Sequence, residues 1–191
     1  MVSKQRIFIV AALAISLLGC ARAGEPTAFE LASKGDQYVG TQSKGKVVQI
    51  RSEKSIGTMT PDIWYVVYYD PDATFKSVQV KFGAGKEMEV THPLRILEMA
   101  TDQHDVLDKE KLKVDSDRAL KIAMSQPLLR NLKLKASKLT LGHGDEGPVW
   151  TVELWAAKLK NPDDNADVGA VILSATDGKV IKADLHPNSV D

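Results

Sequence analysis

Asp163, Asn165 and Asp167 are the residues whose types and spacing come nearest to a recognisable chemistry, the binding of calcium. Oxygen ligands at positions i, i+2 and i+4 open an EF-hand loop, and the stretch DDNAD supplies them. The sixth position of such a loop needs Gly and the twelfth needs Glu, whereas this chain has Val168 and Ser174. A polar loop between two strands explains these side chains better, and we predict no metal site.

A second group of titratable side chains lies at His143, Asp145 and Glu146. A zinc site would need a further ligand cluster, and His92 and His104 are isolated in the sequence. A hydrolase would have to gather this group in a cleft with polar residues distant in sequence. The nucleophile elbow G-x-S-x-G, the P-loop and the dinucleotide fingerprint are absent from the sequence. We therefore predict no catalytic residue and no cofactor.

Two tryptophans and a Gly-Lys pair recur in similar surroundings. Trp64 is the second residue of the stretch IWYVVYY and Trp150 is the first of WTVELW, while Gly178 and Lys179 lie in TDGKVIK. A Trp in a buried strand is more often core than ligand platform. Gly takes the positive φ of a tight turn without steric cost. We expect both tryptophans in the core and Gly178 in a hairpin turn.

The single cysteine, Cys20, directly follows a short uncharged apolar run. Lys4 and Arg6 precede that run, which is the pattern of a secretory signal peptide. The run is shorter than the roughly 20 residues that span a bilayer. A chain with one cysteine can form no intramolecular disulfide, so the informative feature of Cys20 is its position after the apolar run.

The quartet LLGC, Leu17 to Cys20, resembles the lipobox of bacterial lipoproteins. The resemblance implies a signal peptide over residues 1–19, lipidation of Cys20 and a tether over residues 20–27. We expect an exported protein, lipid-anchored to the cell envelope and facing the periplasm or the exterior. Ala21 after the cysteine favours the outer membrane if the source is a diderm. Cleavage after Ala23, at the A-x-A pattern of Ala21 to Ala23, is the alternative.

Charge and composition narrow the class of partner. The chain has 25 basic and 25 acidic residues, with 43% hydrophobic residues. Such a composition is that of a folded globular protein. A balanced charge gives no bulk attraction for nucleic acid. The expected partners are therefore the membrane, through Cys20, and a peptide or protein.

The mature sequence reads as two similar successions of elements. A short helix is predicted over residues 27–39, followed by strands around 46–52, 63–69 and 75–82 and a turn at GAGK. In the second half, Asp115 or Ser116 caps a helix that Pro127 ends. Strands then follow around 132–141, 149–157, 168–175 and 179–185, with a bulge near residues 137–138.

These successions predict an α+β fold of two repeated units, each a helix packed on a small antiparallel β-sheet. The expected first unit is residues 28–100, the helical connector 101–112 and the second unit 113–186. The stretches DSDRALKIA, VWTVEL and VILSATDGKVIKADL of the second unit resemble a PepSY domain. The resemblance implies a helix on an antiparallel sheet, a secreted or membrane-attached protein and association with peptidases. The final motif departs from the family pattern, because Ser174 replaces an acidic residue and Asp177 splits the Thr-Gly pair.

The resulting hypothesis is a non-enzymatic envelope lipoprotein that binds a peptide or protein partner. Regulation of an envelope peptidase is one function that such binding could serve. Edge strands or exposed sheet faces would supply the contact surface. A structural or assembly lipoprotein of the envelope is the alternative, and a hydrolase is a weaker third.

Overall fold

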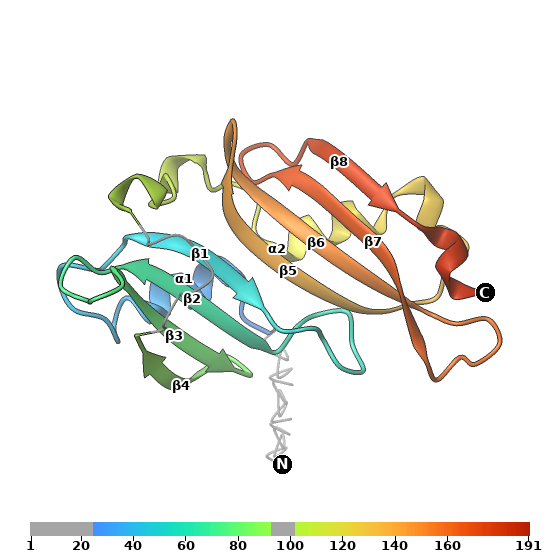
Figure 1. The fold of residues 1–191 in the computed structure, drawn as a ribbon, viewed down its shortest axis with the longest axis horizontal. Helices are drawn as coiled ribbons and strands as arrows, with labels where there is room; N and C mark the ends of the chain where they lie inside the picture. Colours follow the sequence, from blue (N-terminus) through green and yellow to red (C-terminus); the bar gives the residue numbers. More distant parts are fainter. Residues whose placement is uncertain (1–24, 93–101) are drawn as a thin grey trace, which may run out of the picture.

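The computed structural model describes residues 25–92 and 102–191, so Cys20 lies outside the described residues. Eight antiparallel strands form one sheet in the order β4-β3-β2-β1-β5-β6-β7-β8 (Figure 1). The strands are β1 (Val47–Ser52), β2 (Ile63–Tyr69), β3 (Ser77–Gly83), β4 (Lys86–Thr91), β5 (Leu134–Gly144), β6 (Gly147–Ala157), β7 (Asn165–Ser174) and β8 (Val180–Leu185).

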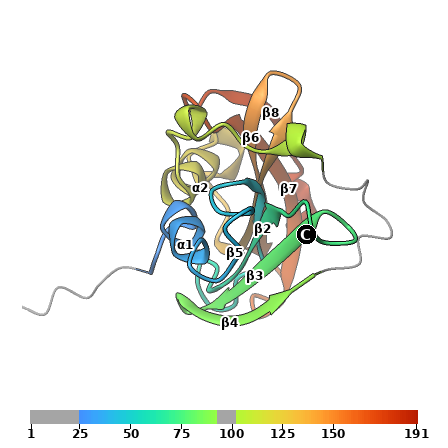
Figure 2. The ribbon, with the colours of Figure 1, turned by 90° about the vertical axis from the view of Figure 1, so that its left-hand side faces the viewer.

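Two α-helices, α1 (Ala28–Gly35) and α2 (Ser116–Met124), lie on the same side of this sheet (Figure 2). Thr27 and Glu30 form a capping box at the start of α1. Asp115 caps α2, as its sequence predicts. Helix α1 contacts β1 and β2, and α2 contacts β5 and β6. The described residues also include the 3-10 helices η1 (Gln103–Asp105), η2 (Lys109–Lys111), η3 (Pro127–Leu129) and η4 (Pro187–Val190).

The predicted fold class of two units, each a helix on its own small sheet, is wrong. Strand β1 pairs with β5 through Ile50–Leu141 and Arg51–Thr140, and this pairing makes a single sheet of all eight strands. An unpaired β1 and β5 would each present a row of free backbone groups at a sheet edge. Pairing the two strands removes both edges, which is the physical reason for one sheet.

Serine side chains extend the joint between β1 and β5 where the backbone pairing stops. The Leu139 N–H donates to Ser52 Oγ at 2.9 Å, and the Ser137 N–H donates to Ser55 Oγ at 2.9 Å. The Ser55 N–H in turn donates to the Ser137 carbonyl at 2.8 Å. All three serines are buried. These bonds satisfy backbone donors that the short ladder leaves without partners.

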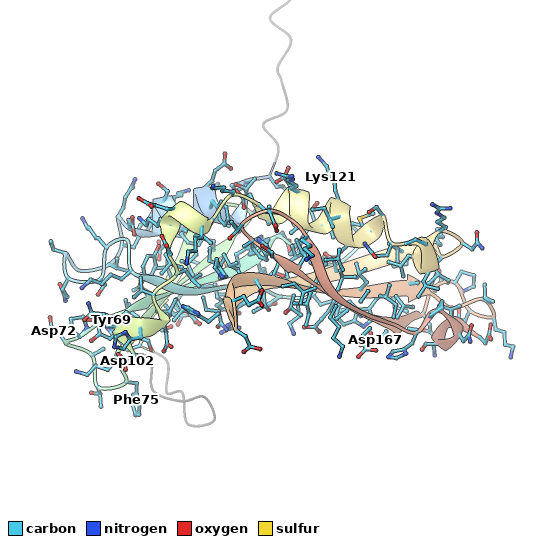
Figure 3. All side chains as sticks on the ribbon, turned by 90° about the horizontal axis from the view of Figure 1, so that it is seen from above. Tyr69, Asp72, Phe75, Asp102, Lys121 and Asp167 are labelled. Atoms are coloured by element: carbon cyan, nitrogen blue, oxygen red, sulfur yellow. The ribbon has the colours of Figure 1, made fainter. Side chains whose placement is uncertain are left out.

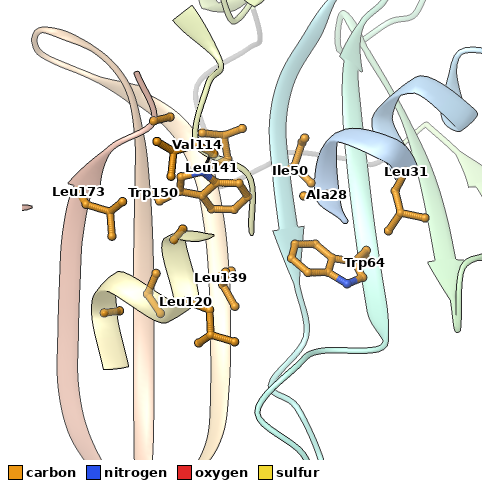
Figure 4. Close-up of a cluster of buried hydrophobic side chains, with 14 of the residues drawn as sticks. Ala28, Leu31, Ile50, Trp64, Val114, Leu120, Leu139, Leu141, Trp150 and Leu173 are labelled. Atoms are coloured by element: carbon orange, nitrogen blue, oxygen red, sulfur yellow. Dashed lines mark hydrogen bonds between the residues drawn. The ribbon is translucent and has the colours of Figure 1, made fainter. Parts of the chain in front are cut away.

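The two predicted core tryptophans are confirmed as such, and they lie on the helix side of the sheet (Figure 4). Trp64 Nε1 donates to the Pro61 carbonyl at 2.9 Å, and Trp150 Nε1 donates to the Val114 carbonyl at 2.7 Å. Phe29 of α1 stacks against Trp150 of β6, with ring centroids 6.3 Å apart. One hydrophobic core therefore connects the two halves of the chain.

Both edge strands carry features that oppose further strand pairing. The register of β4 slips between Lys81 and Phe82 of its neighbour β3, and that of β8 slips beside Leu173. Each slip marks a bulge or irregularity in the ladder, and each edge strand has six residues including charged ones. Bulges, short length and charge are the devices that keep sheet edges from pairing. The sheet edges are therefore poor candidates for a strand-adding partner.

Candidate functional site

The face of the sheet opposite α1 and α2, here called the outer face, has no α-helix of residues 25–92 and 102–191 packed on it. Figure 3 shows Tyr69 and Asp167 on this side and Lys121 of α2 on the other. Strand register places one residue of every strand in a single row across the face. The row runs Glu89, Lys81, Tyr65, Arg51, Thr140, Thr151, Ile172 and Lys182, and all eight residues are half-buried or exposed.

Arg51 and Lys81 flank the ring of Tyr65 in this row. The Arg51 guanidinium lies 4.3 Å from the ring centroid and the Lys81 ammonium lies 5.3 Å from it. Arg51 Nη2 also donates to Gln79 Oε1 at 2.8 Å. The Tyr65 hydroxyl donates to Glu53, and Lys81 Nζ lies 3.7 Å from a Glu53 oxygen. A hydrogen bond with Tyr65, aided by the charge of Glu53, raises the pKa of Lys81, so this side chain is cationic.

A second cation–aromatic pair lies across the β1–β5 joint. Lys54 follows β1 in the chain, and its ammonium lies 4.3 Å from the centroid of the Trp155 ring on β6. Lys138 of β5 forms an ion pair of 2.8 Å with Glu153, the residue two positions before Trp155. We call the eight residues around the joint the central patch: Arg51, Glu53, Lys54, Tyr65, Lys81, Lys138, Glu153 and Trp155.

Such an arrangement suits binding rather than bond making. Aromatic rings under cations offer contact area and fixed charge, and they supply no nucleophile.

The hollow beside Trp64, lined by Pro26, Pro61 and Gly85, has room for about one water molecule. It is therefore too small for an organic substrate.

The group at His143, Asp145 and Glu146 lies at the tip of the β5–β6 hairpin, and all three residues are exposed. Within residues 25–92 and 102–191, no group of three or more His, Cys, Asp or Glu side chains could hold a metal ion. The cleft that a hydrolase would need around His143 is not formed by these exposed side chains.

The predicted loop residues Asp163, Asn165 and Asp167 are exposed. Asn165 and Asp167 belong to β7, and Asp167 Oδ1 accepts from the Gly169 N–H at 2.8 Å. His92 lies 3.9 Å from the Asp70 carboxylate, far along the chain from the other histidines.

The hairpin turn predicted at TDG is confirmed. Gly178 has φ of +82°, and Asp177 accepts from the Lys179 N–H at 3.0 Å. This bond is the main reason that the pKa of Asp177 is lowered. Lys179 is exposed. The Gly-Lys pair is thus turn geometry and a solvated charge.

Sequence reasoning missed Arg51, Lys54, Tyr65 and Trp155. A local signal existed for two of them, because Arg51 and Trp155 alternate with buried residues along their strands. That alternation indicates an outward side chain but not its neighbours. The neighbours depend on the pairing of β1 with β5, which joins positions about 90 residues apart.

Comparisons with protein-family models, with curated proteins and with solved structures found no match for this chain. Among the described residues, no helix has the length and apolar character needed to cross a bilayer.

Proposed function

We propose that this protein is a non-enzymatic lipoprotein of the bacterial cell envelope that binds a peptide or protein partner through its outer face. The observation that carries the proposal is the row of half-buried and exposed residues across eight strands, with cations held on Tyr65 and Trp155. A broad face with fixed aromatic and charged groups is suited to a macromolecular partner, whereas a small ligand needs a concave site.

Two sequence features support the envelope location and the class of partner. Cys20 in the LLGC quartet supports a lipid anchor, and several acyl chains on one residue would hold the protein stably on a bilayer. The resemblance of residues 115–123 and of the β7–β8 hairpin to PepSY domains supports a peptidase as the partner. Mass spectrometry of the mature amino terminus tests the anchor, and an unmodified chain starting at Gly24 would contradict it.

Site-specific crosslinking tests the binding face. A photoreactive phenylalanine analogue at Thr151, in the centre of the outer-face row, should give crosslinked adducts of defined mass with the partner in cells of the source bacterium. The same analogue at Lys121, on the exposed side of α2, is the matched control because this residue faces the other way (Figure 3). Equal adducts at both positions, or none at Thr151, would contradict the proposal. Mass spectrometry of the adducts would also show whether the partner is a peptidase.

A further inference from the structure

Two cations of the central patch form no ion pair within the described ranges, although carboxylates lie nearby. Glu53 pairs with Lys81, and Glu153 pairs with Lys138. Arg51 instead lies on Tyr65 and binds the neutral Gln79, and Lys54 lies on Trp155. The patch thus has four cations and two carboxylates, in a chain whose basic and acidic residues are equal in number.

The chemistry of these two cations points to an anionic ligand. A guanidinium that stacks on a ring keeps its N–H donors at its rim, where they match a carboxylate. Lys54 adds an exposed point charge on the far side of the β1–β5 joint. Both cations are already oriented by a ring, so less conformational entropy is lost when an anion binds.

We propose that the central patch binds an acidic, extended segment of a partner protein, with carboxylates placed on Arg51 and Lys54. This inference rests on the proposed function, because it names the chemistry of the partner at the same face. The surface is one face of a sheet, with Arg51 on the ring of Tyr65 and Lys54 on the ring of Trp155, so an extended chain can lie across the joint and reach both cations. Edge pairing is not needed, which agrees with the bulged and charged edge strands.

The position of the anchor favours a protein segment over a lipid headgroup. Helix α1 begins at Ala28, directly after its cap Thr27, on the side of the sheet opposite the patch. Cys20 lies seven positions before Thr27, and a fully extended chain covers at most about 3.6 Å per residue, roughly 25 Å here. A lipidated Cys20 would therefore tether the chain from the helix side of the sheet, which is the side opposite the central patch.

Fluorescence anisotropy of a labelled decapeptide of alternating Glu and Gly tests this assignment, with the full chain in a non-ionic detergent. We expect binding at low salt that weakens as salt screens the charges, and no binding of the matched Gln-Gly decapeptide. Trp155 is half-buried whereas Trp64 and Trp150 are buried. A change in tryptophan emission on binding would therefore report Trp155.

The double variant Arg51→Gln/Lys54→Gln should weaken binding of the acidic decapeptide at least tenfold. The control Arg118→Gln/Lys121→Gln removes the same two charges from exposed positions of α2 and should change the affinity less than twofold. If Arg51→Gln/Lys54→Gln does not fold, two other variants test the same point. Arg51→Lys/Lys54→Arg exchanges the two residue types, keeps both positive charges and should retain binding. Lys54→Gln alone should weaken binding.

Three results of the binding measurements would overturn the inference: equal affinity in Arg51→Gln/Lys54→Gln and the wild type, equal binding of the Gln-Gly decapeptide, or binding of vesicles rich in phosphatidylglycerol without binding of the peptide. The proposed function fails separately. Crosslinks at Thr151 that persist in Arg51→Gln/Lys54→Gln would refute the acidic segment and leave the binding face standing. Binding of the acidic decapeptide without crosslinks at Thr151 in cells would refute the proposed binding of a protein partner and leave the affinity of the central patch for carboxylates standing.

Discussion

Gly169 of β7 is the position where a single methyl group should do the most measurable damage to the sheet. Its φ is +101°, a conformation that residues with a Cβ rarely adopt, and a Cβ built there would lie 2.0 Å from the Asp184 carbonyl oxygen of β8. Ordinary contacts of a Cβ begin at 3.4 Å. Gly169→Ala therefore requires β8 to move away by roughly 1 Å or more, or β7 to change its backbone conformation.

The expected cost follows from these two effects. The backbone conformation costs an alanine about 1–2 kcal/mol, and forced overpacking costs about 1–3 kcal/mol. We expect a loss of about 3 kcal/mol in the free energy of unfolding, which lowers Tm by roughly 6–12 °C for a chain of this size. Because β8 is an edge strand, part of the effect should appear as faster amide hydrogen exchange in Val180–Leu185.

The matched control is Gly142→Ala in β5, where an added Cβ meets no atom within 4 Å and φ is ordinary. This control should be neutral or stabilising by up to about 1 kcal/mol, since alanine loses less backbone entropy on folding than glycine. Urea unfolding of both variants beside the wild type measures the difference. Stabilities of the two variants within about 0.5 kcal/mol of each other would refute the reasoning, because the close approach of β7 and β8 would then have no energetic consequence.

Three further variants test the turn, the core and the joint. Ala84→Asn should raise the free energy of unfolding by about 0.5–1 kcal/mol in urea, because Ala84 has φ of +47° in the β3–β4 turn, where Asn-Gly is preferred. Tyr68→Phe removes a buried hydrogen bond to α1 and should cost about 1 kcal/mol at pH 8. Burial raises the pKa of Tyr68, so its contribution is complete below the unfolded value of 10.0 and is lost as the pH rises above it. Urea titrations from pH 8 to pH 11 should therefore show the cost shrinking, and a constant cost would contradict this. Ser52→Ala leaves the buried Leu139 N–H without its acceptor and should cost about 1–3 kcal/mol. Ser77→Ala removes a buried hydroxyl that has no hydrogen-bond partner among the described residues and should cost less than about 0.5 kcal/mol; equal costs would refute the role of the Ser52 hydroxyl.

Local elements of the fold were predictable because their signals are local. Asp115 before an amphipathic stretch indicates a helix start, and α2 begins at Ser116. Alternation in WTVEL predicts that Trp150, Val152 and Leu154 share a face, and all three are fully buried. The predicted bulge in β5 exists, but its register shifts between Leu134 and Ala136 rather than near residues 137–138. Periodicity detects such a phase change without fixing its position.

The single sheet was not predictable from these signals. Each half of the chain has enough strands to form a sheet alone, so pattern and propensity are equally compatible with two sheets or one. Whether one sheet or two sheets form depends on the pairing of Ile50 with Leu141 and of Arg51 with Thr140, positions about 90 residues apart in the chain. Three buried serines then complete the joint. Ser52 and Ser137 lie in predicted strands and Ser55 lies between two predicted strands, and no local signal indicates that they meet.

The same pairing decides what the outer face can do. In two separate sheets, Arg51 on β1 and Lys138 on β5 would lie at two different edges. In one sheet they lie near its middle, where neighbouring strands hold Tyr65 and Trp155 in place. Cations at a sheet edge discourage strand pairing, whereas cations in the centre of a broad face can meet a partner's carboxylates. The joint between β1 and β5 thus places side chains that would otherwise protect a sheet edge in the central patch of the proposed binding face.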